Sequence, residues 1–377
     1  MANTLTNLIP LAYEALDVVS REVTGFIAAV NLDAAAETIA KGQTVYSPVA
    51  PVNTTGNITP AMTVTAASDQ TIGTKSLVID SYKSSGFNWT AEEEFGLNSG
   101  VRLESIMRDQ LTQCFRVHAN EIETALGTLA AAGASRAIGT TAGTAPILAD
   151  FAGAQKILTD NGAPMTDRSV VLNTTAGVAL RGIANLYKVN EAGDSGLLRN
   201  GTLGNLYGFG IRESAGISSA TAGTGTSYTT TAAGFAVGTT SLPLITGSGT
   251  VLAGDIVTFA GDSNKYVVTT GVAAPGTIEI AAPGLRVAMS AATKAMTIFG
   301  TSARNIALSR NAITLATRLP KFQAGDQAAD RYVITDPNTG LSFELTMWPG
   351  QRMVKYEVSI AYGMSVIKPE HLAVIIG

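Results

Sequence analysis

The chain has 377 residues, a formal net charge of −4 and only 14% charged residues, and this length allows two or three packing units with an extensive core. Low charge with a mean hydropathy of +0.23 excludes disorder driven by charge, and a pI near 5.3 argues against non-specific nucleic-acid binding through a basic face. Cys114 is the one cysteine in the sequence, which excludes an intrachain disulfide framework and a multi-cysteine metal cage.

The first predicted element is an amphipathic helix, or a pair of helices, over residues 8–30. Apolar residues recur there at spacings of three and four, and Glu14 and Asp17 lie off that stripe. The stripe is expected to pack on the chain's own domain or on a neighbouring copy, whereas a membrane surface is disfavoured because the polar face is acidic. A further interpretation has Glu14 and Asp17 bind a basic assembly partner, which makes them the partner-binding candidates of the sequence.

A long excursion resembling a hairpin is predicted over residues 41–89. Its first part, 41–60, is rich in Pro, Asn, Thr and Gly, which disfavour a long regular element. Residues 62–67 and 76–82 are predicted strands. After this excursion, the spacing of Thr90 and Glu93 predicts a capping box for a short acidic helical turn over 91–95.

The strongest helical pattern covers residues 101–132. Leu111, Phe115, Ile122 and Leu126 belong to one apolar stripe along it, and Gly133 stands where the helix is expected to stop. A helix of this length is a rod of about 45 Å, roughly three times the length of an average globular helix.

An α/β stretch follows the long helix, and an unusually uncharged segment follows that. The predicted elements of the α/β stretch are helices over 150–161 and 174–186 and strands over 169–173 and 207–213. Residues 216–300 carry six charged side chains in 85 positions, and short β-type runs recur at about ten-residue spacing between Gly- and Pro-bearing turns. These runs lie at 241–245, 255–260, 266–270 and 277–280. They predict a small inserted all-β barrel or sandwich, after which helical or mixed structure is expected over 303–319.

The C-terminal part has the clearest strand pattern. Residues 332–335 and 341–347 flank the sequence Asp-Pro-Asn-Thr-Gly at 336–340, which favours a hairpin turn. From 354 to 366 apolar and small or polar residues alternate without interruption, which predicts a strand about 43 Å long. A long helix combined with long antiparallel strands indicates an extended plate more than a sphere.

Catalytic and ligand-binding motifs are nearly missing from the sequence. It has two histidines, His118 and His371, no G-x-S-x-G elbow and no P-loop. Cys114 and His118 are one helical turn apart, but zinc usually needs three or four protein ligands, so a buried thiol beside a histidine is the favoured interpretation. Glu92, Glu93 and Glu94 favour a solvated, helix-capping role over a cation site. No catalytic, cofactor-binding or metal site is predicted.

Segments that would direct the chain to a membrane are also not expected. No apolar run reaches the roughly 18 residues that span a bilayer, and residues 1–10 lack the basic start of a signal peptide. We therefore expect a soluble chain that is made and kept inside a cell.

The order of these parts resembles the major capsid (coat) proteins of tailed bacteriophages, most closely the short-tailed phage subgroup with an inserted β-barrel domain. Three stretches carry the resemblance: 358–374, an apolar run through Tyr-Gly into a Lys-Pro-Glu turn; 252–261, similar to a strand entry of the inserted barrel; and 101–132, which matches the family's spine helix in place and length. The resemblance implies an α+β fold with an N-terminal arm, an extended loop, a peripheral domain, an axial α/β domain and the insert.

The resemblance implies boundaries for each of these parts. They are the arm at 1–40, the extended loop at 41–89, the peripheral domain at 90–145 and 321–377, the axial domain at 146–215 and 301–320, and the insert at 216–300.

The resemblance also implies a structural and non-enzymatic role. The chain would form hexamers and pentamers of an icosahedral head that encloses double-stranded DNA, assembled in the bacterial cytoplasm as a procapsid and retained in the virion. A scaffolding protein and a portal at one vertex are the implied partners, and the packaged DNA would be contacted only weakly. Low charge and long flat elements suit such self-association. The alternative is a β-rich surface-layer or adhesin-type structural protein.

Overall fold

The computed structural model describes residues 8–22, 25–49, 55, 57, 60, 62, 72–98, 103–140, 142–187, 204–322, 328 and 330–377. The helices described are α1 (Ile9–Glu22), α2 (Phe26–Ala29), α3 (Ala91–Asn98), α4 (Leu103–Gly133), α5 (Leu148–Asp160), α6 (Thr174–Arg181), α7 (Ala184–Tyr187), η2 (Arg310–Ala312) and η3 (Pro369–His371). The strands are β1 (Asn31–Ile39), β2 (Gln43–Val49), β3 (Gly73–Ile79), β4 (Ser81–Thr90), β5 (Arg136–Ile138), β6 (Arg168–Leu172), β7 (Asn205–Leu206), β8 (Phe209–Glu213), β9 (Ser219–Ala220), β10 (Thr226–Thr230), β11 (Ser241–Ser248), β12 (Ile256–Phe259), β13 (Lys265–Thr270), β14 (Thr277–Ile280), β15 (Met296–Ile298), β16 (Ser302–Ser309), β17 (Ile313–Pro320), β18 (Asp330–Thr335), β19 (Ser342–Gly350), β20 (Met353–Val366) and β21 (Leu372–Ile376).

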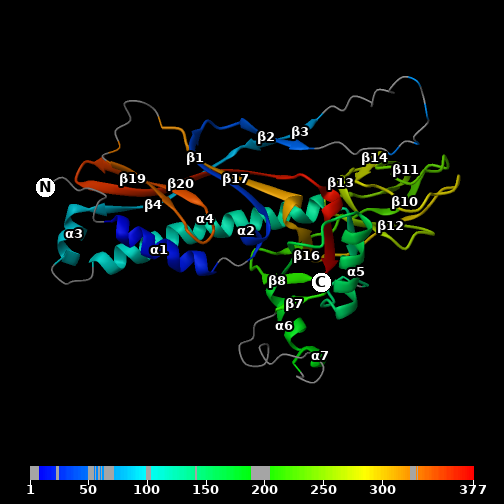
Figure 1. Cartoon of the computed structure of the whole chain (residues 1–377), viewed down its shortest axis with the longest axis horizontal. Helices are drawn as coiled ribbons and strands as arrows, with labels where there is room; N and C mark the ends of the chain where they lie inside the picture. The colour runs from blue at the N-terminus through cyan, green and yellow to red at the C-terminus, as the bar shows by residue number, and fades with distance from the viewer. Residues whose placement is uncertain are drawn as a thin grey trace.

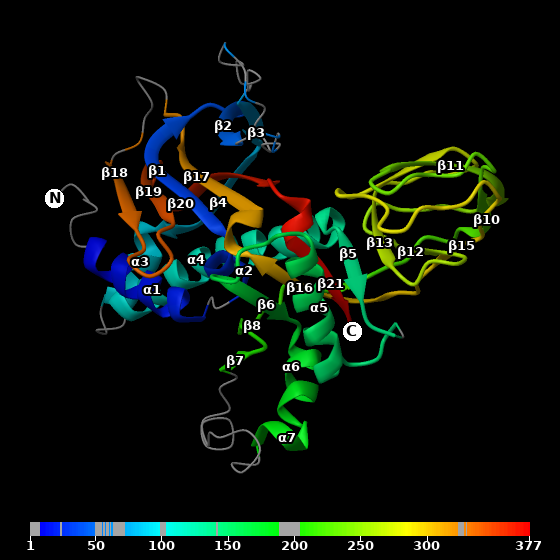
Figure 2. The same ribbon diagram turned by 45° about the vertical axis from the view of Figure 1, so that its right-hand side comes forward.

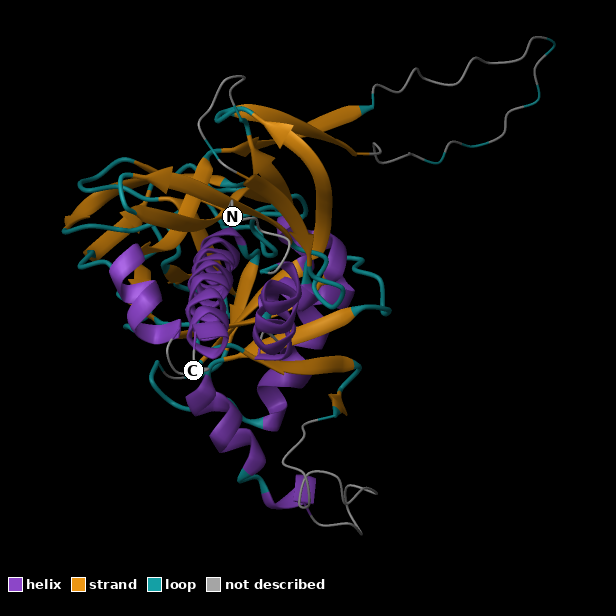
Figure 3. Ribbon diagram, turned by 90° about the vertical axis from the view of Figure 1, so that its left-hand side faces the viewer, coloured by secondary structure: helices purple, strands orange, loops and turns teal. Residues whose placement is uncertain are grey.

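The molecule is elongated, with α4 lying along its long axis (Figure 1). The α4 helix has 31 residues, which confirms the predicted long helix and its end at Gly133. Its stripe of Leu111, Phe115, Ile122 and Leu126 is almost completely buried between α1 and a sheet. The Phe115 ring meets the edge of Phe343 from β19 at a centroid distance of 5.2 Å. Figure 3 shows this arrangement along the helix axis, with the helices below the sheet.

The sheet over α4 has six strands in the order β1-β17-β20-β19-β18, with β4 paired to β20. The long alternating strand is confirmed as β20, whose 14 residues pair with β4 on one side and with β19 and β17 on the other. The predicted turn at 336–340 is confirmed too, because the Asp336 carboxylate accepts the Asn338 backbone N–H at 3.0 Å and Gly340 takes a φ of 76°. This sheet and α4 pack against each other as two extended layers.

The helical or mixed structure expected over 303–319 is wrong, because this stretch forms β16 and β17. Every residue of β16 is buried, as are most residues of β17. Strands that are covered on both faces lose the alternation that distinguishes a strand in the sequence. The strand β1 was not predicted either. It belongs to the expected arm but pairs in parallel with β17.

A second sheet has 13 strands, and its central neighbours are β5, β21, β16, β6 and β8 in that order. The predicted helix over 150–161 and strand over 169–173 are confirmed as α5 and β6, whereas the helix over 174–186 is divided into α6 and α7. The α5 and α6 helices pack on β6, β16 and β21 around a separate apolar core that includes Phe151, Leu158 and Phe209. β16 belongs to this larger sheet and β17 to the six-stranded sheet, although only η2 lies between them in the sequence.

The strands β10 to β15 form a lobe at one end of the molecule (Figure 2). All four short runs predicted between 241 and 280 are strands, β11 to β14. They enclose their own apolar cluster, in which Tyr228, Phe259 and Tyr266 are the largest side chains. The strands of the lobe continue the 13-stranded sheet, because Tyr266 of β13 pairs with Arg136 of β5. That this lobe is an independent inserted barrel stays a prediction.

The predicted excursion contains an antiparallel pair, β2 and β3, in register from Gln43↔Ile79 to Val49↔Gly73. The single strand expected over 76–82 is divided at Asp80 between β3 and β4. The strand expected over 62–67 is not formed at Met62, which lies in a bend, and its other residues lie outside the described part of the chain.

Candidate functional site

The histidine and cysteine of the long helix lie in its packed face against β20. His118 is 2% exposed, and its Nε2 is 3.0 Å from the Val358 carbonyl oxygen, which it contacts as a donor. Cys114 is buried one turn away, and burial raises the pKa of its thiol. Within the described ranges, no group of three or more His, Cys, Asp or Glu side chains could hold a metal ion. Both side chains are thus buried in the packed face of α4.

Burial of His118 predicts how the free energy of unfolding changes at acidic pH. Desolvation lowers the His118 pKa, although the hydrogen bond to Val358 and the charge of Glu121 oppose this and Lys83 adds to it. Below about pH 6.5 the unfolded chain therefore takes up a proton that the folded chain refuses, and stability falls as the pH falls towards the folded pKa. In urea titrations between pH 7 and pH 5, we expect His118→Gln to flatten this decline by up to about 1.4 kcal/mol per pH unit.

The second buried histidine provides the comparison. The His371 pKa is also lowered by desolvation, so His371→Gln should remove a separate share of the slope and the double variant should be flatter than either single one. If stability declined equally between pH 7 and pH 5 in wild type and in the double variant, the decline could not come from the two histidines.

The acidic run at 92–94 lies in the first turn of α3. The backbone N–H of Thr90 donates to Glu93 at 2.9 Å, and the N–H of Glu93 approaches the Thr90 hydroxyl at 3.3 Å, which confirms the predicted capping box. The backbone N–H and the hydroxyl of Thr90 both donate to the Glu93 carboxylate and lower its pKa. Capping explains this carboxylate without a cation.

The partner-binding candidates Glu14 and Asp17 both lie on α1. The apolar side of α1, with Ala12, Leu16 and Val19, is buried against the molecule's own core. Glu14 is exposed and pairs with Arg108 of α4 at 3.1 Å, and Asp17 is half-buried and also makes a polar contact. The two acidic residues thus lie on one turn of a helix docked within the chain, and their binding of a partner stays a prediction.

The sequence pattern did not indicate Glu123, which joins three segments. This side chain of α4 is 6% exposed and accepts the backbone N–H groups of Phe26 and Ile27 at 2.9 and 2.8 Å. It also accepts the Ser214 hydroxyl at 2.8 Å. A carboxylate at the start of α2 satisfies amide groups that the helix itself leaves open. Its only signal in the sequence is its position beside Ile122 in the buried stripe.

The β2–β3 pair presents apolar side chains to solvent. Tyr46 is 68% exposed and Val78 is 46% exposed, and Ile72, just before β3, is 68% exposed. The pair lies along one side of the molecule, away from α1 and α4 (Figure 1). Large apolar groups exposed on one projecting element are typical of a surface that another molecule covers.

No known family model matches the chain, and no curated protein matches it. A solved structure described as the capsid of the cyanophage P-SCSP1u is similar over 93% of this chain and 88% of its own, with 11% identity and a TM-score of 0.51. A structure from Mycobacterium phage Che8 has 16% identity and a TM-score of 0.47, covering 93% and 90% of the two chains.

The cyanophage likeness shows a shared fold along nearly the whole chain. The α+β fold expected from the resemblance to tailed-phage capsid proteins is therefore confirmed. In the part of the chain that the structure describes, no helix is both long enough and apolar enough to cross a bilayer.

Proposed function

We propose that this chain is a major capsid protein that assembles with copies of itself into the hexamers and pentamers of an icosahedral phage head. The observation that carries the proposal is the fold likeness to the cyanophage P-SCSP1u capsid over 93% of the chain. A capsid protein acts by associating with copies of itself and does not require a catalytic centre. We therefore propose a structural and non-enzymatic role in the virion.

The shape and surface of the molecule support this proposal. Long strands and a 31-residue helix give a flat, extended subunit with a large area for lateral contact. The exposed apolar side chains of the β2–β3 pair suit a hairpin that lies over a neighbour, as the resemblance implies. Many modest interfaces add up to a stable closed shell, and low charge suits their cores.

The finer parts of the proposal concern domains and partners. We propose the five-part division given above, with 41–89 as the extended loop and 216–300 as the insert. We also propose a scaffolding protein and a portal as assembly partners, weak contact with packaged double-stranded DNA, and assembly in the bacterial cytoplasm. A net charge of −4 supports weak DNA contact, because tight contact needs basic side chains on phosphates.

Electron microscopy of the purified full chain tests the proposal. We expect closed shells, or rings of five and six subunits, when the protein is concentrated. Planar two-dimensional lattices would instead support a surface-layer protein. A protein that stays monomeric at high concentration, both alone and with a co-expressed scaffolding protein, would overturn the assembly proposal.

The role proposed for Glu14 and Asp17 is tested by co-sedimentation with the scaffolding partner at low salt. We expect Glu14→Ala with Asp17→Ala to reduce binding several-fold, because an exposed ionic contact weakens when one charge is removed. Arg108→Ala is the matched control, since it breaks the same Glu14–Arg108 pair but keeps both acids. If Arg108→Ala and the double variant lost the same amount of binding, the effect would come from weaker docking of α1. The proposed contact of Glu14 and Asp17 with the partner would then be wrong.

A further inference from the structure

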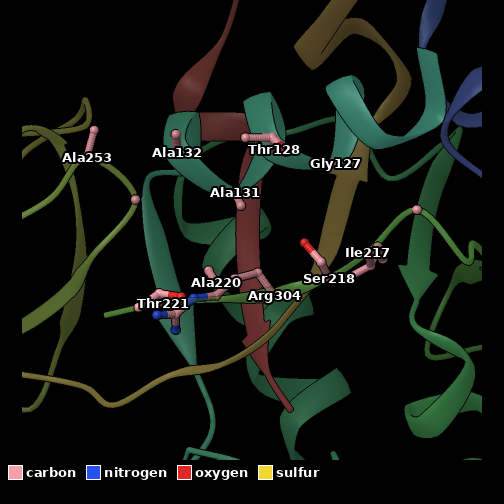
Figure 4. A pocket seen from close by; sticks show the side chains of 12 residues that line it. Gly127, Thr128, Ala131, Ala132, Ile217, Ser218, Ala220, Thr221, Ala253 and Arg304 are labelled. Carbon is pink, nitrogen blue, oxygen red and sulfur yellow. The ribbon is translucent and has the colours of Figure 1, made fainter. Parts of the chain in front are cut away.

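A pocket of about 160 Å³ lies where the three main parts of the molecule meet. Its walls come from the last turns of α4, from the segment around Ser218 and Thr221, and from the turn at Ala253 and Gly254 that precedes β12. Arg304 of β16 completes it (Figure 4). Small side chains line most of the wall, and these leave a space several times the roughly 30 Å³ that one water occupies in the liquid.

The guanidinium of Arg304 is buried in this pocket without a partner. The residue is 2% exposed, and Nε, Nη1 and Nη2 all lack a hydrogen-bond partner among the residues that the structure describes. A buried cation with open N–H groups is costly, because it has lost water and gained no acceptor. Desolvation accordingly lowers the Arg304 pKa, and only the charge of Asp255 opposes this.

Asp255 does not fill the role of that missing acceptor. Its carboxylate is 2% exposed and accepts the Leu252 backbone N–H at 2.7 Å and the Gly223 backbone N–H at 3.1 Å. Those amides hold the carboxylate against the backbone of the lobe. The Arg304 nitrogens have no acceptor among the described residues, and the planar arrangement of five N–H donors on a guanidinium suits an oxyanion.

The other polar groups of the pocket suit the same class of ligand. Ser218 and Thr221, which lie on either side of β9, contribute hydroxyl groups, and Thr221 lies beside the end of the Arg304 side chain in Figure 4. Thr128 already donates its hydroxyl to the Thr124 carbonyl at 3.0 Å. None of the described residues that line the pocket is acidic. The nearby Asp255, whose charge acts on Arg304, is held by backbone N–H groups of the lobe.

We propose that this pocket binds a small tetrahedral oxyanion of the phosphate class, with Arg304 as its main ligand. An ion held here contacts β16 and the entry to the β10–β15 lobe beside the end of α4, and so it stabilises the junction of these parts. The proposal concerns the single folded chain and does not depend on assembly of a shell.

Thermal unfolding of the unassembled full chain tests the proposal, with inorganic phosphate compared with chloride at equal ionic strength. We expect phosphate to raise the wild-type Tm by about 3 °C or more at a hundredfold excess over its Kd. Arg304→Met should abolish this shift. In chloride alone this variant should be at least as stable as wild type, because it removes a buried charge without a partner.

Two further variants keep the test decisive if Arg304→Met fails to fold. Thr221→Val keeps the guanidinium but removes one donor, and it should weaken phosphate affinity several-fold with little change in the Tm in chloride. Arg310→Met makes the same charge change at an exposed position after β16, and its phosphate shift should equal that of wild type.

Three results would overturn the proposal. The first is a wild-type Tm that does not respond to phosphate, or an equal response in Arg304→Met. The second is a response to short duplex DNA but not to inorganic phosphate, which would assign the guanidinium to packaged nucleic acid. The third is a stabilisation that appears only on assembly in phosphate-free buffer and is lost in Arg304→Met, which would assign it to a carboxylate of a neighbouring copy.

Discussion

Replacing Glu123 with alanine is expected to lower the free energy of unfolding by about 3–5 kcal/mol, because three buried donors lose a charged acceptor at once. These donors are the Phe26 and Ile27 amides and the Ser214 hydroxyl, all within 2.9 Å of the carboxylate. Gly25 makes this close approach possible, since a Cβ there would collide with the Glu123 carboxylate. Urea unfolding of the full chain at neutral pH measures the loss.

Two variants separate the hydrogen bonds from the charge and from the helix. Glu123→Gln keeps one acceptor oxygen, so its cost should be intermediate. Glu104→Ala removes an exposed carboxylate from the first turn of the same helix, and it should cost less than about 1 kcal/mol. A Glu123→Ala variant within 1 kcal/mol of wild type would contradict the role that the contacts give this residue.

The sequence predicted those elements whose pattern is local. The helix over 101–132 and the strand over 354–366 were predicted to within two residues, because one face of each is buried and the other is not. The capping box at Thr90 and the turn at Asp336 depend on side chains that bond the backbone within four residues, so they too can be inferred from spacing.

Elements defined by distant partners could not be predicted in this way. β1, β16 and β17 depend on strands far away in the chain, and the full burial of β16 removes its alternation. The same limit applies to the sites. Glu123 and Arg304 look like ordinary charged residues in the sequence. Only the fold shows that Glu123 has three donors around it and that Arg304 has no acceptor within the described part of the chain.

The second large effect is expected at Gly363, where the base of the β2–β3 pair crosses β20. A Cβ at this position would collide with the Val78 carbonyl oxygen and lie 3.0 Å from the Ile79 Cα. Both are backbone atoms, so the clash cannot be relieved by rotating a side chain. Gly363→Ala should therefore lift β3 from the sheet and expose Leu77 and Ile79, which are 3% and 0% exposed.

Exposure of these two side chains should lower local stability by about 2–4 kcal/mol. Burial of each large apolar group contributes roughly 1.5–3 kcal/mol, and the displaced hairpin keeps part of that burial. Amide hydrogen exchange should accelerate at least tenfold in β2 and β3 and stay unchanged in α5. Gly204→Ala is the matched control, because a Cβ there would have no atom of the described residues within 4 Å.

Gly363→Ala is also expected to impair assembly. If the hairpin lies over a neighbouring subunit, its direction is set at the crossing with β20, and a small tilt there moves the exposed Tyr46 far from its place. The folded Gly363→Ala protein should then remain as monomers or irregular aggregates under conditions in which wild type and Gly204→Ala form shells. Normal shells from a variant whose β3 amides exchange rapidly would contradict this, because a loosened hairpin would then make no difference to association.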